Sequence, residues 1–297
     1  MKIKLIILAV SLLVGIMGVN AKNNALLVGI GNYNTATTGW QPISGNNDVD
    51  LLEGKLKDKG FSVNTLKDSN ATKNNILSSL ENLIKSSKAG DVVYIHFSGH
   101  SQLVEDMNND EPDGYDVAFI CYDACISPEY NGSPYKGENH LIDDELFPYF
   151  NSLKKKVGKK GKIVAVFDTS HTFHLEDGNS QTIANGEAKQ NGINPASHLV
   201  FSAEGNSNEY LKNITKPGTF NSDGGEIILI NACDRNGRNY EKRDKQTGKN
   251  YGALSYCIGE LFDNNIPMKE WPKFFRNKKY REYKIFRPTQ NPGVIVY

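Results

Sequence analysis

Residues 91–102 read DVVYIHFSGHSQ, an apolar stretch that ends in a polar turn carrying a histidine. Its β-branched and aromatic residues are typical of a strand buried on both faces of a parallel sheet. Residues 162–167 (KIVAVF) form a second such run, and it also ends in polar residues, Asp168-Thr169-Ser170-His171. Because ligands bind outside the carboxyl ends of strands in open parallel sheets, both strand ends are candidate sites.

Apolar runs and helical patterns alternate on both sides of these two stretches. The strands expected from such runs span residues 24–30, 61–66, 91–97, 162–167, 197–203, 226–232 and 293–297. Apolar residues at helical spacing predict two helices, one with Val49, Leu52 and Leu56 on its face and one with Ile76, Leu77, Leu80, Leu83 and Ile84. Further helices are expected at residues 143–153 and 253–262. This order predicts an α/β fold with a doubly wound, mostly parallel sheet.

Composition and charge exclude several classes of protein. The 297 residues include 34 Lys plus Arg and 34 Asp plus Glu, so the formal charge is zero and we expect no nucleic-acid partner. With 38% hydrophobic residues and a mean hydropathy of −0.49, the chain is neither a polytopic membrane protein nor a disordered one. Its four cysteines show no CxxC spacing, so we expect structural thiols rather than a zinc or redox motif.

The first 21 residues have the pattern of a secretory signal peptide. Two lysines precede an apolar run at residues 5–19, and Val19-Asn20-Ala21 resembles a small-residue cleavage site. An uncleaved membrane anchor is the alternative, but the apolar run is shorter than the roughly 20 residues that span a bilayer. We therefore expect residues 22–297 to be a secreted or periplasmic protein with no stable membrane anchor after signal cleavage. The sequence does not specify its oligomeric state.

A histidine and a serine follow the two strands described first. If the strands at residues 91–97 and 162–167 are neighbours, His100 and Ser170 approach each other at one edge of the sheet. A general base beside a nucleophile is the arrangement needed for acyl transfer. The sequence therefore predicts a candidate catalytic site formed by His100 and Ser170.

Six segments together resemble the caspase-like peptidases, and among them the metacaspases and their bacterial relatives. They are ALLVGIGNY, SGNNDVDLLEGKLKDKGF, GDVVYIHFSGHSQ, DEPDGYDVAFICYD, HLIDDELF and VAVFDTSH. The resemblance covers nearly all of residues 22–297 and implies the three-layer α/β/α fold of that family. It also implies a large-subunit-like half at about residues 22–175, a linker at about 172–196 and a small-subunit-like half at about 197–297.

The segment that matches the nucleophile of the family departs from the family pattern. Active relatives carry cysteine within a pattern close to Asp-Ser-Cys-His-Ser-Gly, whereas this chain has Ser170 there, and Ser101 follows His100 where relatives usually have glycine. A thiol has a pKa of about 8.5 that a histidine readily lowers, while a serine hydroxyl needs a closely placed base and gains from a third orienting group. We therefore expect a protein with the fold of a cysteine-type endopeptidase but with weak or no peptidase activity. It would bind peptides or partners through its cleft.

Two alternatives stay open at this point. The first is a working serine hydrolase with basic specificity, in which the backbone N–H groups of Ser170 and Ser101 form an oxyanion hole. The second is an interaction domain whose acidic loop binds calcium. The sequence alone does not decide between these alternatives and an impaired peptidase.

The same resemblance implies a preference for Arg or Lys before the cleaved bond. The positions that match the acidic first pocket of the family are Asp48 and Asp168, with Ser98 as a further lining residue. Two carboxylates suit a guanidinium, so we expect the partner to be a peptide or protein with Arg or Lys. For Asp48 the alternative is an N-cap of the helix that starts there.

An acidic cluster is the candidate calcium site. Its members are Asp106, Asp110, Glu111, Asp113, Asp116, Asp143, Asp144 and Asp177. An EF-hand is excluded, because counting from Asp106 the sixth residue is Glu111 and the twelfth is Val117. The resemblance implies a calcium site formed by Asp116 (or Asp113), Asp143, Asp144 and Asp177. No cofactor is required for the catalytic pair, and the alternative to calcium is a solvated turn with acidic residues at a helix N-terminus.

Overall fold

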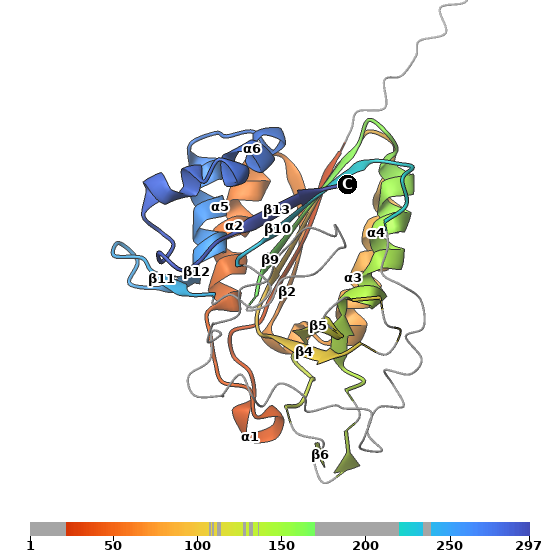
Figure 1. Cartoon of the computed structure of the whole chain (residues 1–297), viewed down its shortest axis with the longest axis vertical. Coiled ribbons are helices and arrows are strands. Elements are labelled where there is room, and N and C mark those ends of the chain that lie inside the picture. The colour runs from red at the N-terminus through yellow and green to blue at the C-terminus, as the bar shows by residue number, and fades with distance from the viewer. Residues whose placement is uncertain are drawn as a thin grey trace, which may run out of the picture.

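The computed structural model describes residues 22–106, 108, 110–111, 114–126, 129–130, 133–135, 137–169, 220–233 and 239–297. Ser170, Asp113, Asp177, the predicted signal peptide, the linker at 172–196 and the predicted strand at 197–203 lie outside these ranges. Within them, one six-stranded sheet is covered by helices on both faces (Figure 1). This is the α/β architecture that the sequence predicts.

The central sheet is parallel except at one edge. Its strands are β1 (Asn23–Gly29), β2 (Phe61–Lys67), β3 (Val92–Ser98), β9 (Lys162–Asp168), β10 (Glu226–Asn231) and β13 (Gly293–Val296), in the order β13-β10-β9-β3-β1-β2. Only β13 pairs antiparallel with its neighbour. The other five strands run in the same direction, so their carboxyl ends lie on the same side of the sheet, across the strand direction. β3 and β9 are direct neighbours, so the condition on which the predicted site depends is met.

Side chains of the sheet alternate between two hydrophobic cores. In β1, Leu26 and Val28 belong to one core, whereas Ala25 and Leu27 belong to the other. The first core contains residues of the helices α3 (Lys73–Ser86) and α4 (Asp143–Val157), and the second contains residues of α2 (Gly45–Asp58), α5 (Ala253–Asp263) and α6 (Trp271–Arg276). Figure 1 shows these two groups of helices on opposite faces of the sheet. Burying one Leu, Val or Ile side chain contributes roughly 1.5–3 kcal/mol, so both cores are major sources of stability.

The helix ends agree in part with the sequence signals. The Thr72 hydroxyl caps α3 by accepting a hydrogen bond from the Asn75 backbone N–H at 3.3 Å. Gly60 has a φ of 79° and directly follows the end of α2, as expected of a glycine at a helix C-terminus. Glycine is common at helix C-termini, and Gly90 also has a positive φ of 88°, but α3 ends at Ser86, so Gly90 does not stop that helix. Gly90 instead forms the turn into β3, where its N–H donates to the Val157 carbonyl.

Several short elements were not expected from the sequence. β4 (Ser101–Glu105), β5 (Tyr115–Ile120) and β8 (His140–Ile142) form a three-stranded sheet around the acidic segment. The other short elements are α1 (Thr35–Thr38), η1 (Asp68–Asn70), β6 (Glu129–Tyr130), β7 (Ser133–Pro134), β11 (Glu241–Arg243), β12 (Asn250–Gly252), η4 (Met268–Glu270) and η5 (Lys279–Tyr283). They contain too few residues to produce a readable periodicity. Among the helices of the described residues, none is both long and apolar enough to cross a membrane.

The four cysteines are buried and carry free thiols. Burial raises the pKa of the Cys121 thiol well above its usual value and also raises the pKa of the Cys257 thiol. Buried protonated thiols are poor nucleophiles. All four thiols are buried, as expected of structural cysteines.

Candidate functional site

Two neighbouring parallel strands bring the predicted site residues to the same edge of the sheet. β3 ends at Ser98, whose Cα partner on β9 is Asp168. His100 follows Ser98 by two residues, and Ser170 follows Asp168 by two residues. Ser170 lies outside the described residues, so its contact with His100 stays a prediction.

The His100 ring is oriented by a backbone carbonyl. Only 2% of His100 is exposed, and its Nε2 atom lies 2.8 Å from the carbonyl oxygen of Gln41. A carbonyl can only accept, so Nε2 carries the proton, and in a neutral ring Nδ1 then carries the lone pair that a general base needs. The sequence shows no orienting carboxylate, and the structure supplies a backbone group in its place. No sequence signal identifies Gln41, because any residue type has this carbonyl.

Two aromatic residues pack against the His100 ring. The ring centroids of Tyr33 and Trp40 lie 5.0 and 5.1 Å from that of His100. The Tyr33 hydroxyl accepts from the His100 backbone N–H at 3.1 Å and donates to the Ile120 carbonyl at 3.0 Å. Burial raises the pKa of Tyr33 well above its usual value, so the hydroxyl keeps the proton that this second hydrogen bond requires. Trp40 therefore packs within the site itself.

Asp68 fixes the loop that carries Gln41. Its carboxylate accepts from the backbone N–H groups of Gly31 and Asn32, each at 2.8 Å, and from the side-chain amide of Asn46 at 3.2 Å. A carboxylate with several N–H donors holds a loop more firmly than neutral hydrogen bonds do. Asp68 thus orients His100 indirectly, through the loop and the Gln41 carbonyl, and sequence reasoning did not identify it.

Asp48 and Ser98, two of the residues predicted to line the first pocket, are in direct contact. Both are fully buried, and the Ser98 hydroxyl donates to Asp48 Oδ2 at 2.5 Å. Asp48 Oδ1 accepts from the backbone N–H of Gly252 at 2.8 Å. α2 begins at Gly45 and its cap residue is Ser44, so the alternative interpretation of Asp48 as an N-cap is wrong. Asp48 lies one turn too far into the helix to cap it.

Asp168, the third predicted pocket residue, contacts residues 252–255, the segment that also contacts Asp48. Its Oδ2 atom accepts from the backbone N–H of Ser255 at 2.8 Å and from the Ser255 hydroxyl at 2.6 Å, and its Oδ1 atom accepts from the Asn239 amide at 2.6 Å. A Cβ atom added to Gly252 would lie 2.0 Å from Asp168 Oδ2. Gly252 therefore contacts both carboxylates, and the three predicted pocket residues are brought together around it.

Ser101 directly follows His100 and begins β4. Its Cα partner is Phe119 on β5, and only 2% of the residue is exposed. The preceding residue is tied to the same strand, since the Ile120 N–H donates to the His100 carbonyl at 3.0 Å. The oxyanion hole expected from Ser101 and Ser170 needs both N–H groups, and therefore stays a prediction.

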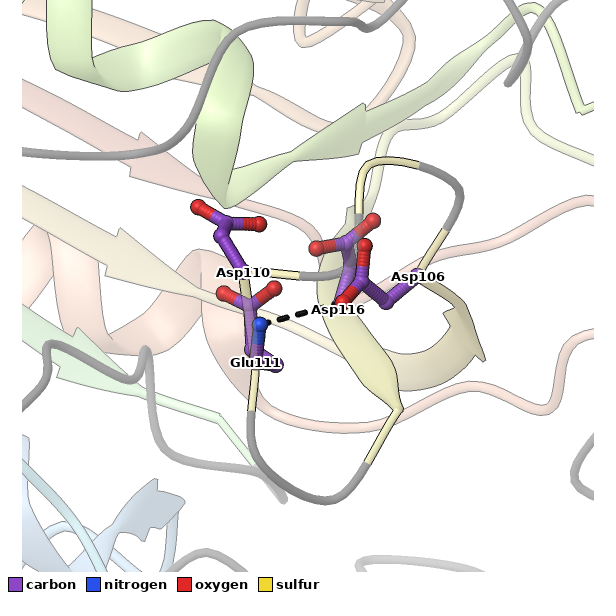
Figure 2. A group of neighbouring side chains, drawn as sticks. All are labelled: Asp106, Asp110, Glu111 and Asp116. Carbon is purple, nitrogen blue, oxygen red and sulfur yellow. Dashed lines mark hydrogen bonds between the residues drawn. The ribbon is translucent and has the colours of Figure 1, made fainter.

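Four carboxylates meet at the turn between β4 and β5. One oxygen each of Asp106, Asp110, Glu111 and Asp116 lies within 4.8 Å of the others, and Figure 2 shows the side chains gathered around this turn. The Glu111 backbone N–H also donates to Asp106 Oδ2 at 3.0 Å. Of the predicted calcium ligands, Asp116 belongs to this group. Asp113 and Asp177 lie outside the described residues.

Asp143 and Asp144 extend the acidic cluster from the start of α4. Asp143 Oδ1 accepts from the Val117 N–H at 3.1 Å, and Asp144 Oδ2 accepts from the Asn108 amide at 2.5 Å. Burial, together with the charges of Asp116 and Asp110, raises the pKa of Asp144 to about 7. Burial and the charge of Asp143 also raise the pKa of Glu111.

The donor set of the acidic cluster fits a hard divalent cation. Its ligands would all be carboxylate oxygens, which calcium prefers. Asp144 Oδ1 and Glu111 Oε2 are buried and have no hydrogen-bond partner among the residues that the structure describes. A bound cation would reduce the mutual repulsion of the carboxylates and would give these two buried oxygens a partner. Sequence reasoning gave Asp106, Asp110 and Glu111 as members of the cluster, but not as ligands.

Comparison with known proteins agrees with this geometry. A family model described as the caspase domain matches residues 22–270. A metacaspase-1B of Aspergillus terreus is 32% identical over 102 residues, which is 34% of this chain and 23% of that protein. A metacaspase-2 of Trypanosoma brucei brucei is 26% identical over 261 residues, which is 81% of this chain and 64% of that protein. The chain thus spans less than two thirds of the length of either relative.

A solved structure shows the same fold. Protein GSU0716 of Geobacter sulfurreducens superposes with a TM-score of 0.62 at 18% identity, and the match covers 93% of each chain. With its six-stranded, mostly parallel sheet and a histidine after β3, this is a caspase-like α/β protein. The chain belongs to the caspase-domain family, as the match over residues 22–270 shows.

Proposed function

We propose that the chain is an exported, metacaspase-like protein that binds peptides through Arg or Lys and cleaves them weakly or not at all. The observation that carries this proposal is the orientation of His100 by the Gln41 carbonyl at the carboxyl end of β3, next to the end of β9. The base of a peptidase site is thus preorganised, while Ser170 stands where active relatives carry cysteine. The exported location rests on the sequence of residues 1–21 alone.

The chemistry expected at His100 follows from its tautomer. Nδ1 accepts a proton from the nucleophile while Nε2–H stays bonded to Gln41, which spreads the positive charge that develops on the ring. With a thiol, this proton transfer is nearly complete before attack, because the pKa values of the two groups are close. With the Ser170 hydroxyl, proton transfer has to accompany attack, and the site offers a carbonyl instead of an orienting carboxylate. We therefore expect a rate lower by several orders of magnitude than that of a cysteine enzyme.

Basic specificity is supported by the two carboxylates around Gly252. Asp48 and Asp168 lie at the edge of the sheet where a substrate side chain next to Ser170 would enter, and a guanidinium pairs well with carboxylates. Ser98 holds Asp48 through its hydroxyl. The expected partner is accordingly a peptide or protein segment with Arg or Lys at the contacted position.

Calcium is the proposed cofactor of the acidic cluster. Asp116, Asp143 and Asp144 would hold it together with Asp106, Asp110 and Glu111, all through carboxylate oxygens. When bound, calcium supplies positive charge that neutralises the cluster. β5 carries Asp116 near one end and Ile120 at the other, and the Ile120 N–H donates to the His100 carbonyl. Ordering this strand would therefore also steady His100.

Peptide cleavage by the wild type and by Ser170→Cys tests the proposal. We expect little or no cleavage by the wild type. Ser170→Cys should cleave after Arg or Lys, but not after Asp. Ser170→Cys/His100→Ala should be inactive, and Ser152→Cys, which places a thiol on the exposed side of α4, should stay inactive as the matched control. Wild-type activity as high as that of Ser170→Cys, and abolished by His100→Ala, would support the serine hydrolase instead. If neither the wild type nor Ser170→Cys cleaves peptides, and neither binds an Arg peptide, the result would favour the interaction domain.

Export has its own test. Expression of the full chain in a bacterial host should yield a product outside the cytoplasm whose N-terminal residue is Lys22. A product that retains residues 1–21 and sediments with membranes would contradict signal cleavage and support the anchor.

A further inference from the structure

A cavity of about 360 Å³ lies at the amino ends of the strands, away from His100. Its lining includes the first residues of four strands: Asn23 of β1, Phe61 of β2, Val92 of β3 and Lys162 of β9. The remaining lining residues are Lys59, Phe262, Asn265, Ile266, Pro267, Met268 and Lys269. His100 follows the opposite end of β3, so the cavity and the candidate active site lie at opposite edges of the sheet. In Figure 1 the amino ends of the five parallel strands are at the same end of the molecule as α6, and β4 and β5 are at the other.

The floor of the cavity is apolar. Phe61 and Phe262 belong to the second hydrophobic core and are only 8% and 5% exposed, and Ile266 and Met268 pack against that core. A volume of about 360 Å³ is at the lower end of the range of small-molecule sites. An apolar group placed there would be removed from water on several sides, which is favourable.

The rim of the cavity is positively charged. Three of the eleven lining residues are lysines, and none is Asp or Glu. Lys162 pairs with Glu226, which lies outside the lining. Lys59 Nζ contacts only the neutral Asn265 Oδ1, at 2.5 Å, and neither Lys59 nor Lys269 forms an ion pair within the described part of the chain. Two exposed ammonium groups beside the apolar floor therefore have no carboxylate partner among the described residues.

Helix capping explains only one of these lysines. Lys59 is the C-cap residue of α2, where the helix dipole favours a cation. Lys269 belongs to the short helix η4, so that argument does not apply to it. An apolar floor beside two exposed lysines that lack a carboxylate partner matches a ligand with an apolar tail and an anionic head.

We propose that this cavity binds a small amphiphilic carboxylate, with its hydrocarbon tail on Phe61, Phe262 and Met268 and its carboxylate on the ammonium groups of Lys59 and Lys269. The ligand class is a medium-chain fatty acid. This site requires neither His100 nor Ser170 and does not depend on the proposed peptidase function.

Calorimetric titration of the full chain with octanoate, octanol and octylamine tests the assignment. We expect octanoate to bind at millimolar concentration, octanol to bind about three- to tenfold more weakly, and octylamine not to bind. Lys269→Gln should weaken octanoate binding about two- to fivefold without changing octanol binding. Lys245→Gln, which removes an exposed lysine from the turn between β11 and β12, is the matched control and should leave both affinities unchanged.

Amide chemical shifts locate the bound ligand. Octanoate should shift the signals of Phe61, Val92 and Met268 and leave those of Ser98 and Ser101 in place. Equal affinities for octanoate and octanol, equal effects of Lys269→Gln and Lys245→Gln, or shifts centred on Ser98 and Ser101 would each overturn the proposal. So would an absence of octanoate binding at millimolar concentration.

Discussion

The carboxylate of Asp168 and residue Ser255 are joined by two hydrogen bonds, one from the Ser255 backbone N–H at 2.8 Å and one from its hydroxyl at 2.6 Å. Ser255 is the third residue of α5, so Asp168 supplies an acceptor for the N-terminus of a helix that is remote in sequence. The Ser255 oxygen also lies 3.0 Å from His96 Nε2. Because its single proton goes to Asp168, it accepts the His96 proton. One hydroxyl thus links β3, β9 and α5 at the candidate pocket.

Ser255→Ala should destabilise the protein by about 1–3 kcal/mol, because it leaves a buried carboxylate and a buried imidazole each without one partner. Ser152→Ala is the matched control, since it removes an exposed hydroxyl that donates to the Pro148 carbonyl within α4. The free energy of unfolding in urea measures both changes. Equal and small losses for the two variants would show that the Asp168 contact is not a stabilising one.

Gly252→Ala should also destabilise the protein, by about 1–3 kcal/mol, because the new methyl group would overlap Asp168 Oδ2. Gly54 offers a matched control in α2, where an added Cβ meets nothing within 4 Å. Gly54→Ala should therefore raise stability by about 0.5–1 kcal/mol. Thermal unfolding of the two variants should shift in opposite directions, and a neutral Gly252→Ala would contradict the tight contact at the pocket.

The sequence could predict that β3 and β9 are buried strands with polar carboxyl ends, because both are continuous apolar runs. It did not predict that they pair with each other, which the structure shows. The partners of the site residues could not be predicted either. Gln41 acts through a backbone carbonyl that every residue type has, and Ser255 is 87 residues from Asp168 in the chain. The β4–β5–β8 sheet was missed for a related reason. Its strands are short, and an acidic turn separates β4 from β5, so no long apolar run marks this sheet in the sequence.

His140 should make the protein less stable in acid. Burial, and then the charge of Lys73, lowers the pKa of His140 from 6.5 to about 3. Its ring contacts the Tyr135 hydroxyl at 2.9 Å and Gln102 Oε1 at 3.1 Å. Between pH 6.5 and 3 the unfolded chain binds a proton here that the folded protein does not, so stability falls as the pH falls, by at most about 1.4 kcal/mol per unit.

His140→Gln removes this titration and isolates its effect. The free energy of unfolding of the variant should fall less steeply between pH 6.5 and 4 than that of the wild type, whatever the offset between the two curves at pH 7. Parallel curves over this interval would mean that His140 binds protons equally in the folded and the unfolded protein, so that its pKa is not lowered by folding.

Calcium should stabilise the protein through the acidic cluster. A ligand that binds only the folded state at about 100 times its dissociation constant adds about 2.7 kcal/mol, and magnesium should add less, because it demands a smaller octahedral site. Asp116→Asn should remove most of this gain. Asp58→Asn, at the exposed end of α2, is the matched control and should keep it. Thermal unfolding in calcium and in a chelator measures the difference.

The size of the calcium effect should also depend on pH. The pKa of Asp144 is raised to about 7, so below that value its carboxyl group holds a proton that the cation must displace. Above that value the carboxylate is charged and destabilises the cation-free fold, because a raised acid pKa costs stability as the pH rises through it. Bound calcium removes this loss of stability, so the increase in the free energy of unfolding caused by calcium should be larger at pH 8 than at pH 6. A gain that is independent of pH, or that survives Asp116→Asn, would place the cation elsewhere.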